Sequence, residues 1–365
     1  MDATSNGGKS RGGHGHAGQE KAQGFRSRGR AVAGAGERRA ASDLTYGALD
    51  LGTNNCRLLV AVATPKGMQV IDAFSRIVRL GEGLGHHGRL NDAAMDRTIE
   101  ALRVCANKLK WHRVQRFRLV ATEACRLAEN GEGFIRRVAG DVGLELEIID
   151  RETEAHLAAA GAEPLIDQEA QTAVVFDIGG GSTEVMWVAR GETGADVHAW
   201  TSLAAGVVTL SERHGGGRDV TPEKYDAMRD DVRARLLPFI ADVRARVAAD
   251  AVPDHLLGTS GTVTTIAGVQ MGLRHYDRAR VDGSWLDEDA ADSVTAELRA
   301  MSYEERMRNG CIGRERADLV LAGCAILDEI RAAFPNQRIR VADRGLREGI
   351  LSKLMREDGH KGATA

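Results

Sequence analysis

Cysteine is scarce in this sequence, and its spacing excludes the sites that cysteine usually builds. Five cysteines occur among 365 residues, and no two of them form a C-x-x-C pair. The odd number and the scattered positions argue against a disulfide framework and against a structural zinc site. This cysteine usage fits a reducing compartment, so we expect a cytoplasmic protein.

Long apolar runs and a strong net charge are also absent. No apolar run reaches the roughly 18 residues that a membrane span needs, and the N-terminus lacks the apolar stretch of a signal peptide. The formal net charge is only −3, which gives no sign of a membrane surface or a specific nucleic acid as partner. Any anion-binding site must therefore be local and made by geometry.

Length and composition indicate two folded domains that follow a tail. Hydrophobic residues make up 43% of the 365 residues, enough for real cores. Because a single core stops growing at about 250–300 residues, this length favours two domains. Residues 1–43 are rich in Gly, Arg, Ser and Ala and nearly free of large apolar side chains, so we expect a disordered basic tail.

One short pattern occurs twice along the chain. Residues 48–58 read ALDLGTNNCRL and residues 175–185 read VFDIGGGSTEV. Each has a strand, an Asp, an aliphatic residue, a Gly, three small residues and a second strand. This internal repeat predicts two similar α/β domains that face one another across a cleft. The expected strands are Tyr46–Leu51, Cys56–Ala63, Phe117–Ala121, Leu144–Ile149, Ala173–Asp177 and Glu184–Ala189, and a helix capped by Asn91 or Asp92 should run to about Lys110.

The two repeated turns have the chemistry of phosphate loops. Consecutive small residues expose backbone N–H groups that can surround phosphate oxygens, and glycine permits the required backbone angles. Asp50 and Asp177 each end a strand at the expected cleft, and paired carboxylates suit Mg²⁺. The phosphate-binding motif G-x-x-x-x-G-K-[ST] is absent, so a P-loop enzyme is excluded.

Two further loops leave their roles open. Residues 257–263 follow an expected strand and open a helix, so they form either an anion site at a helix N-terminus or a simple turn. Residues 343–349 precede the last helix and are more typical of a structural turn, although Arg344 or Arg347 would reach a long anionic substrate. His86 and His87 lie in a glycine-rich stretch without metal-ligand spacing, and we expect an exposed loop or a flap there.

Six motifs in order resemble the exopolyphosphatase / guanosine pentaphosphate phosphatase family (Ppx/GppA), from about Tyr46 to Leu354. They are DLGTNNCRL at 50–58, ATEACR at 121–126, DIGGGSTE at 177–184, SLAAGVVTL at 202–210, GTSGT at 258–262 and GLREG at 345–349. The resemblance implies a duplicated actin-like ATPase (ribonuclease H-like) fold with two domains around a central phosphate-binding cleft. We expect domain I at 44–158 and domain II at 159–344, with a helix at about 345–357 packing back on domain I.

The resemblance also implies roles for individual residues. Glu154 corresponds to the family's proposed catalytic base, in a stretch, DRETEAHL at 150–157, that departs from the usual SGxEEARL. Thr153 and His156 thus replace a Glu and an Arg, and His156 is either a cleft residue or a helix-surface residue. Phosphate would be bound by Gly52, Thr53, Asn54, Asn55, Arg126, Gly179, Gly180, Gly181 and Ser182. Mg²⁺, with Mn²⁺ as the alternative, would be held by Asp50, Asp177 and Glu184.

Several functions share this chemistry. The expected activity is phosphoanhydride hydrolysis, either release of orthophosphate from the end of inorganic polyphosphate or conversion of guanosine pentaphosphate to tetraphosphate. A non-catalytic regulator that binds an alarmone or another nucleotide is the alternative of a different class. For Arg126 the alternative to phosphate binding is a surface salt bridge. The family's long members carry a C-terminal helical domain with an HD metal motif, which we expect to be absent here, and a homodimer remains open.

Overall fold

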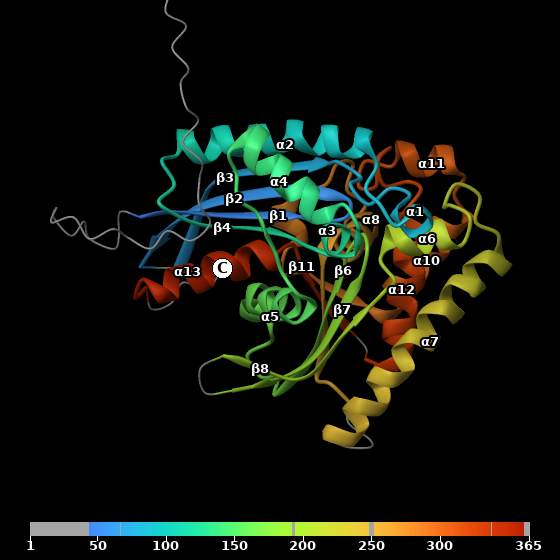
Figure 1. The fold of residues 1–365 in the computed structure, drawn as a ribbon. Helices are drawn as coiled ribbons and strands as arrows, with labels where there is room; N and C mark the ends of the chain where they lie inside the picture. Colours follow the sequence, from blue (N-terminus) through green and yellow to red (C-terminus); the bar gives the residue numbers. More distant parts are fainter. Residues whose placement is uncertain (1–43, 66, 192–193, 248–251, 337, 361–365) are drawn as a thin grey trace, which may run out of the picture.

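Two β-sheets form the framework of the protein. A computed structural model describes residues 44–360, apart from residues 66, 192–193, 248–251 and 337 (Figure 1). The expected tail at residues 1–43 therefore lies outside the described residues. Helices cover both sheets, which confirms the predicted α/β class. None of the helices in the described ranges has both the length and the apolar character that a membrane crossing requires.

The first sheet carries the first copy of the repeat. Its strands lie in the order β3 (Gly67–Ile77), β2 (Asn55–Thr64), β1 (Thr45–Leu51), β4 (Arg116–Ala121) and β5 (Glu147–Ile148). Strand β1 is antiparallel to β2 and parallel to β4. Helices α2 (Asp92–Trp111) and α4 (Gly131–Val142) pack on one face, and α13 (Leu346–Glu357) packs on the other.

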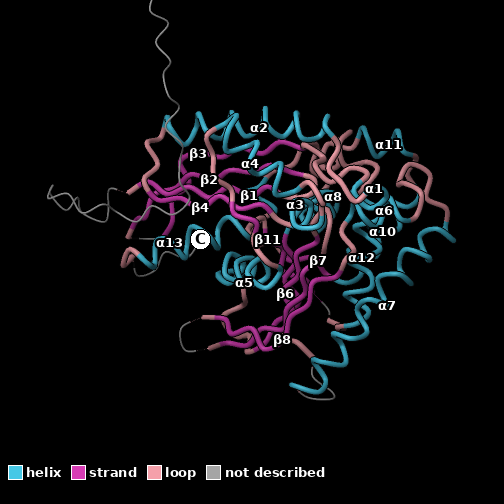
Figure 2. The backbone as a smooth tube through the Cα atoms, in the orientation of Figure 1, coloured by secondary structure: helices cyan, strands magenta, loops and turns pink. Residues whose placement is uncertain are grey.

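The second sheet carries the second copy. Its strands lie in the order β10 (Trp285–Asp287), β11 (Arg338–Ala342), β9 (His255–Thr259), β6 (Thr172–Ile178), β7 (Thr183–Arg190) and β8 (Ala195–Leu203). Four helices pack on one face of this sheet: α7 (Pro222–Arg246), α8 (Ser260–Gln270), α10 (Glu288–Ala300) and α12 (Val320–Ala333). Helix α5 (Arg151–Ala162) packs on the other face. Figure 2 shows most helices on the outer sides of the strands, with α5 and α13 between the two sheets. Shorter helices complete the described chain: α1 (Leu84–His87), α3 (Glu123–Leu127), α6 (Val207–Arg213), α9 (Arg278–Val281), α11 (Tyr303–Arg308) and the 3-10 turn η2 (Glu163–Leu165).

The repeat in the sequence is a repeat in the backbone register. In the first hairpin Asp50 lies opposite Arg57, and in the second Asp177 lies opposite Glu184. The same backbone hydrogen bond closes both turns, from Gly52 N to Asn55 O at 2.9 Å and from Gly179 N to Ser182 O at 3.0 Å. Equivalent positions of the two copies therefore carry the side chains that enter the space between the sheets.

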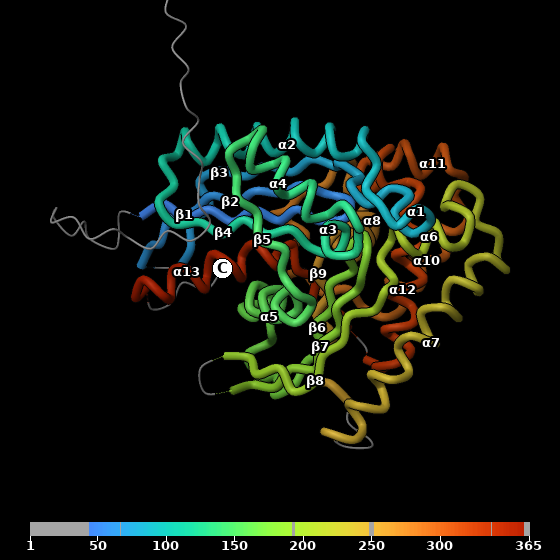
Figure 3. The backbone as a smooth tube through the Cα atoms, viewed as in Figure 1, coloured from blue at the N-terminus to red at the C-terminus, as the bar shows by residue number. Residues whose placement is uncertain are grey.

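Helices α5 and α13 connect the two sheets. Their backbones touch, because a Cβ added at Gly161 would lie 1.9 Å from Gly345 O and one added at Gly349 would lie 1.9 Å from Leu157 O. Figure 3 shows the two helices side by side. Helix α5 packs on the second sheet and α13 on the first, so their contact fixes the sheets relative to one another. The expected domain boundary at residue 158 falls inside α5.

Most of the expected elements are present, with two local differences. Asn91 caps α2 as predicted, since its Oδ1 accepts a hydrogen bond from Ala94 N at 2.7 Å. The strand expected over 144–149 is limited to Glu147–Ile148, because only these residues pair with β4. The loop expected around His86 and His87 is instead the one-turn helix α1, and both histidines are exposed.

Candidate active site

The two repeated turns line one cleft between the sheets. Its volume is about 960 Å³ when the open mouth is included. All the predicted site residues except Arg126 line it: Asp50, Gly52, Thr53, Asn54, Asn55, Glu154, Asp177, Gly179, Gly180, Gly181, Ser182 and Glu184. The structure therefore brings together residues that lie more than a hundred positions apart in the sequence.

The turns approach each other so closely that a side chain on Gly180 or Gly181 would force the neighbouring turn to shift. A Cβ at Gly181 would lie 2.5 Å from Thr53 Oγ1, and a Cβ at Gly180 would lie 3.1 Å from Asn54 N. Glycine is therefore needed here for close approach and not for an unusual backbone angle, since neither residue has a positive φ. The contact places the backbones of both turns on the same stretch of the cleft.

Helix α6 orients the second turn. Val207 N donates to Gly179 O at 2.9 Å, and Val208 N donates to Gly180 O at 2.8 Å. In a trans peptide the N–H points opposite to the preceding C=O. The N–H groups of Gly180 and Gly181 are therefore directed away from α6, and both glycines line the cleft. Such an array of N–H groups is suited to phosphate oxygens.

Acidic side chains gather on the floor of the cleft. Burial raises the pKa of Asp50 and of Asp177, although the nearby Arg57 opposes both shifts. Burial and the charge of Asp177 raise the pKa of Glu184 to about 7. Its Oε1 accepts hydrogen bonds from Ser182 Oγ and Ser202 Oγ, both at 2.8 Å. A cation bound among these acidic groups would stabilise their ionised forms.

Glu154 enters the cleft from the first turn of α5. The helix begins at this point because Asp150 caps it, with Oδ1 accepting from Thr153 N at 2.7 Å. Burial, and then the charge of Glu184, raise the pKa of Glu154 well above its usual value. A carboxyl with a raised pKa in a cleft is the type of group that serves as a general base.

Arg126 lies in the cleft wall and not on its lining. Its Nε donates to Glu123 Oε2 at 3.1 Å, its Nη1 to Ile149 O at 2.6 Å and its Nη2 to Glu154 Oε2 at 2.9 Å. The alternative of a salt bridge therefore describes its contacts, although the bridge is half-buried inside the wall.

Sequence reasoning missed three charged residues of the cleft. Arg57 and Arg316 line it and supply positive charge. Glu123 also lines it, with only 2% of its surface exposed. Burial alone would raise the pKa of Glu123, but hydrogen bonds from Arg151 and Arg126 lower it below the usual value. Arg57 and Glu123 lie inside the quoted motifs and were therefore detectable, whereas nothing in the sequence marks Arg316.

The third and fourth loops have different roles. Ser260, Gly261 and Thr262 line the cleft at the N-terminus of α8, where anions are favoured. Ser260 has a φ of 74°, an uncommon value for a residue with a side chain, and its Oγ donates to Ile178 O at 2.6 Å. In the fourth loop Glu348 accepts from Gly345 N at 3.0 Å, a structural helix cap.

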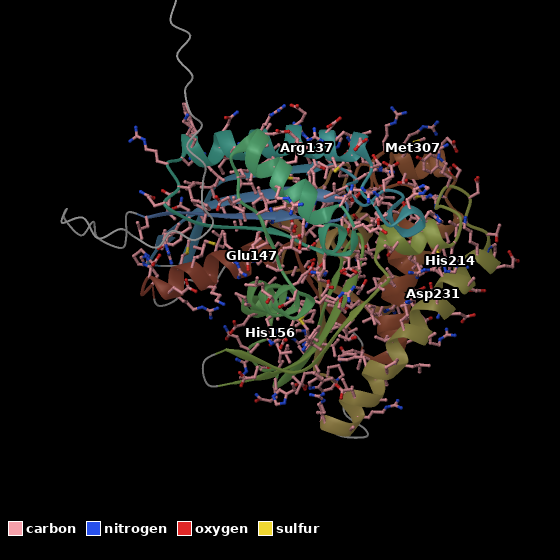
Figure 4. The ribbon with its side chains drawn as sticks, in the orientation of Figure 1. Arg137, Glu147, His156, His214, Asp231 and Met307 are labelled. Atoms are coloured by element: carbon pink, nitrogen blue, oxygen red, sulfur yellow. The ribbon has the colours of Figure 1, made fainter. Side chains whose placement is uncertain are left out.

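His156 lies on the surface of its helix, which is the second of the two alternatives predicted for it. It is exposed on α5, where Figure 4 labels it, and it does not line the cleft. Its Nδ1 lies 2.8 Å from the backbone oxygen of Glu152, one helical turn earlier. The residue that stands at the family's arginine position therefore adds no charge to the cleft lining.

The donor chemistry of the cleft fits Mg²⁺ bound together with substrate. In the described ranges, no group of three or more His, Cys, Asp and Glu side chains is close enough to hold a metal ion by itself. Mg²⁺ usually binds through one or two carboxylates, with waters and substrate phosphates completing its ligands. Asp50 and Asp177 offer hard oxygen donors whose raised pKa values a divalent cation would lower.

Comparisons with known proteins agree with this geometry. The model of the Ppx/GppA phosphatase family matches residues 59–358. Exopolyphosphatase 2 of Mycobacterium tuberculosis is 30% identical over 320 residues, which cover 84% of this chain and 97% of that protein.

Solved structures have the same fold. The Ppx/GppA family member of Aquifex aeolicus superposes with a TM-score of 0.72 at 28% identity, covering 87% of this chain and 99% of that one. An exopolyphosphatase from Cytophaga hutchinsonii gives 0.78 at 23% identity, over 88% and 100% of the two chains, and shows the fold alone. These likenesses confirm the predicted actin-like architecture.

Proposed function

We propose that this chain, which belongs to the Ppx/GppA phosphatase family, is an exopolyphosphatase that releases orthophosphate from the end of inorganic polyphosphate. The observation that carries the proposal is that the pair of small-residue turns lines one cleft together with five acidic side chains: Asp50, Glu123, Glu154, Asp177 and Glu184. The 30% identity to an exopolyphosphatase over most of both chains supports the substrate class.

The backbone N–H groups of both turns bind the terminal phosphates. The N–H groups of Gly180 and Gly181 face away from α6 and supply neutral donors. Arg57 and Arg316 in the lining supply positive charge, and the planar guanidinium matches two phosphate oxygens at once. Because phosphoryl transfer depends largely on positioning and charge neutralisation, these groups carry much of the catalysis.

Hydrolysis needs a water aligned with the terminal phosphorus. We assign Glu154 to accept a hydrogen bond from this water and to take its proton as the water oxygen bonds to phosphorus. The bridging P–O bond then breaks, and the shortened chain leaves with the electron pair. Arg126, 2.9 Å from Glu154, holds the base in place. A carboxylate whose pKa is raised takes up a proton more readily than an ordinary one, which suits it to act as the base.

We propose that Asp50, Asp177 and Glu184 hold Mg²⁺, with Mn²⁺ as the alternative. When bound, the ion would neutralise charge on the phosphate oxygens and on the leaving group. Glu184 is partly tied by the hydroxyls of Ser182 and Ser202, so we expect it to act through a bound water.

A parallel assay of phosphate release tests the proposed function. Purified protein with Mg²⁺ receives long polyphosphate, tripolyphosphate, guanosine pentaphosphate and ATP. The proposal predicts the highest kcat/KM on long polyphosphate. A preference for guanosine pentaphosphate would assign the alternative reaction, and tight binding of that nucleotide without turnover of any substrate would assign the regulator.

We also propose a cytoplasmic location. All five cysteines are free and buried in the structure, an arrangement typical of proteins in a reducing compartment. A homodimer stays a prediction, for which measurement of the mass in solution is the test.

A further inference from the structure

Arg151 contacts an acidic residue of the cleft wall from outside the cleft. It stands at the first position of α5, and its side chain reaches back to Glu123 on α3. Its Nη2 lies 2.8 Å from Glu123 Oε1, and its Nε lies 3.3 Å from Glu123 Oε2. Both carboxylate oxygens are thus held, in the side-on geometry that the planar guanidinium favours.

Glu123 has little freedom to move without disturbing the second phosphate turn. A Cβ at Gly181 would lie 3.0 Å from Glu123 Cγ and 3.2 Å from its Cβ, so the side chain is packed against this turn. The side chain of Glu123 is 3% exposed, whereas that of Arg151 is 39% exposed. Arg151 therefore anchors from the protein surface a carboxylate that is buried in the cleft wall.

Arg126 is the other cation of this cluster, and it serves two carboxylates. Its Nη2 contacts both Glu123 Oε2 and Glu154 Oε2, while its Nη1 is bound to a backbone oxygen. If Arg151 were removed, the whole charge of Glu123 would rest on Arg126. The contact between Arg126 and Glu154 would then weaken, because the two carboxylates would compete for the same N–H groups.

We propose that Arg151 is a positioning residue, which fixes Glu123 and so leaves Arg126 available to hold Glu154 in its catalytic position. The inference rests on the proposed phosphohydrolase function. It also explains how the chain tolerates a departure from the family pattern, since α5 has its arginine at position 151 and an exposed histidine at position 156. The positive charge lies at the end of the helix that faces the cleft.

Three substitutions test this role: Arg151→Met, Arg151→Lys and the control Arg118→Met. Arg118 contacts Glu147 through the same two atoms, Nε at 3.1 Å and Nη2 at 3.2 Å, but neither residue lines the cleft. We expect R151M to lower kcat on polyphosphate about 10- to 100-fold, the loss typical of residues that orient catalytic groups, with KM changed less than about threefold. R151K keeps the charge but not the fork, so its kcat should lie between those of R151M and the wild type. R118M should keep the wild-type kcat.

An unchanged kcat in R151M, or an equal loss in R118M, would overturn the proposal. A large rise in KM with kcat intact would also overturn it, since it would place Arg151 in substrate binding. If the wild type releases no phosphate, the proposed function fails separately. In that case a double-mutant cycle of R151M and E123Q in urea unfolding decides whether Arg151 fixes Glu123. Non-additive stabilities support the positioning contact, and additive ones overturn it.

Discussion

Arg126 Nη2 lies 2.9 Å from Glu154 Oε2, so the arginine expected to bind phosphate is paired with the proposed base. Glu123 takes a second bond from the same nitrogen. We therefore propose that Arg126 sets the position and the charge of Glu154, while Arg57 and Arg316, which line the cleft, are the cations available to substrate.

Replacement of Arg126 by methionine should therefore change the pH dependence of the reaction. The positive charge of Arg126 opposes the burial that raises the pKa of Glu154. Without it the pKa rises further, so more of the base is protonated at neutral pH and a higher pH is needed for activity. We expect the acidic limb of the kcat/KM profile to move to higher pH. An unshifted limb with a raised KM would assign Arg126 to phosphate binding.

A methyl group at Gly206 should displace the second phosphate turn. Its Cβ would lie 2.4 Å from the backbone carbon and oxygen of Gly180, atoms that cannot rotate away. We expect G206A to lose at least about tenfold in kcat/KM, since small displacements of positioning groups have large effects. Gly140 is the control, because a Cβ there meets nothing within 4 Å. G140A should keep wild-type kinetics and gain about 0.5–1 kcal/mol in stability, since Gly140 lies in α4.

The repeat was the part of the architecture that the sequence determined best. The spacing of the two Asp-containing turns predicted two facing hairpins, and both have the same register. The cap at Asn91 was equally accessible, since it depends on residues three positions apart. Local patterns such as these can be predicted from the sequence because the interacting residues are close in the chain.

Contacts between segments that are distant in the chain could not be predicted from the sequence. Arg316 lies in a loop without any motif, and only the fold brings it into the cleft with Arg57. The pairing of Arg151 with Glu123 joins residues 28 positions apart on two helices. The resemblance predicted that Arg126 binds phosphate but not that two carboxylates accept hydrogen bonds from it. Such partners depend on tertiary packing.

Stability should fall as the pH rises through the range in which Glu184 ionises. The pKa of Glu184 is about 7 in the folded protein, against 4.5 for an ordinary Glu. The folded state therefore holds a proton that the unfolded state releases, and this stabilising contribution, fully present below about pH 4.5, is lost by about pH 7. A shift of this size corresponds to roughly 3 kcal/mol.

Urea unfolding of the wild type and Glu184→Gln across this pH range measures that contribution. The glutamine cannot ionise, so we expect a shallower decline in the free energy of unfolding of E184Q. Mg²⁺ should reduce the wild-type decline by binding the ionised carboxylates. Parallel declines in the two proteins would show that Glu184 ionises normally in the folded state.

Glu154 is the proposed base of the phosphohydrolase, and the variant Glu154→Gln removes its ability to take a proton. Glu152 stands two residues earlier in the same helical turn and is exposed, so Glu152→Gln is the matched control. The measurement is the initial rate of orthophosphate release from long polyphosphate at saturating substrate and Mg²⁺. We expect the rate of E154Q to be lower than that of the wild type by about 10²–10⁴-fold, the usual contribution of a general base. The rate of E152Q should equal that of the wild type. Full activity of E154Q would contradict the role of Glu154 as the base.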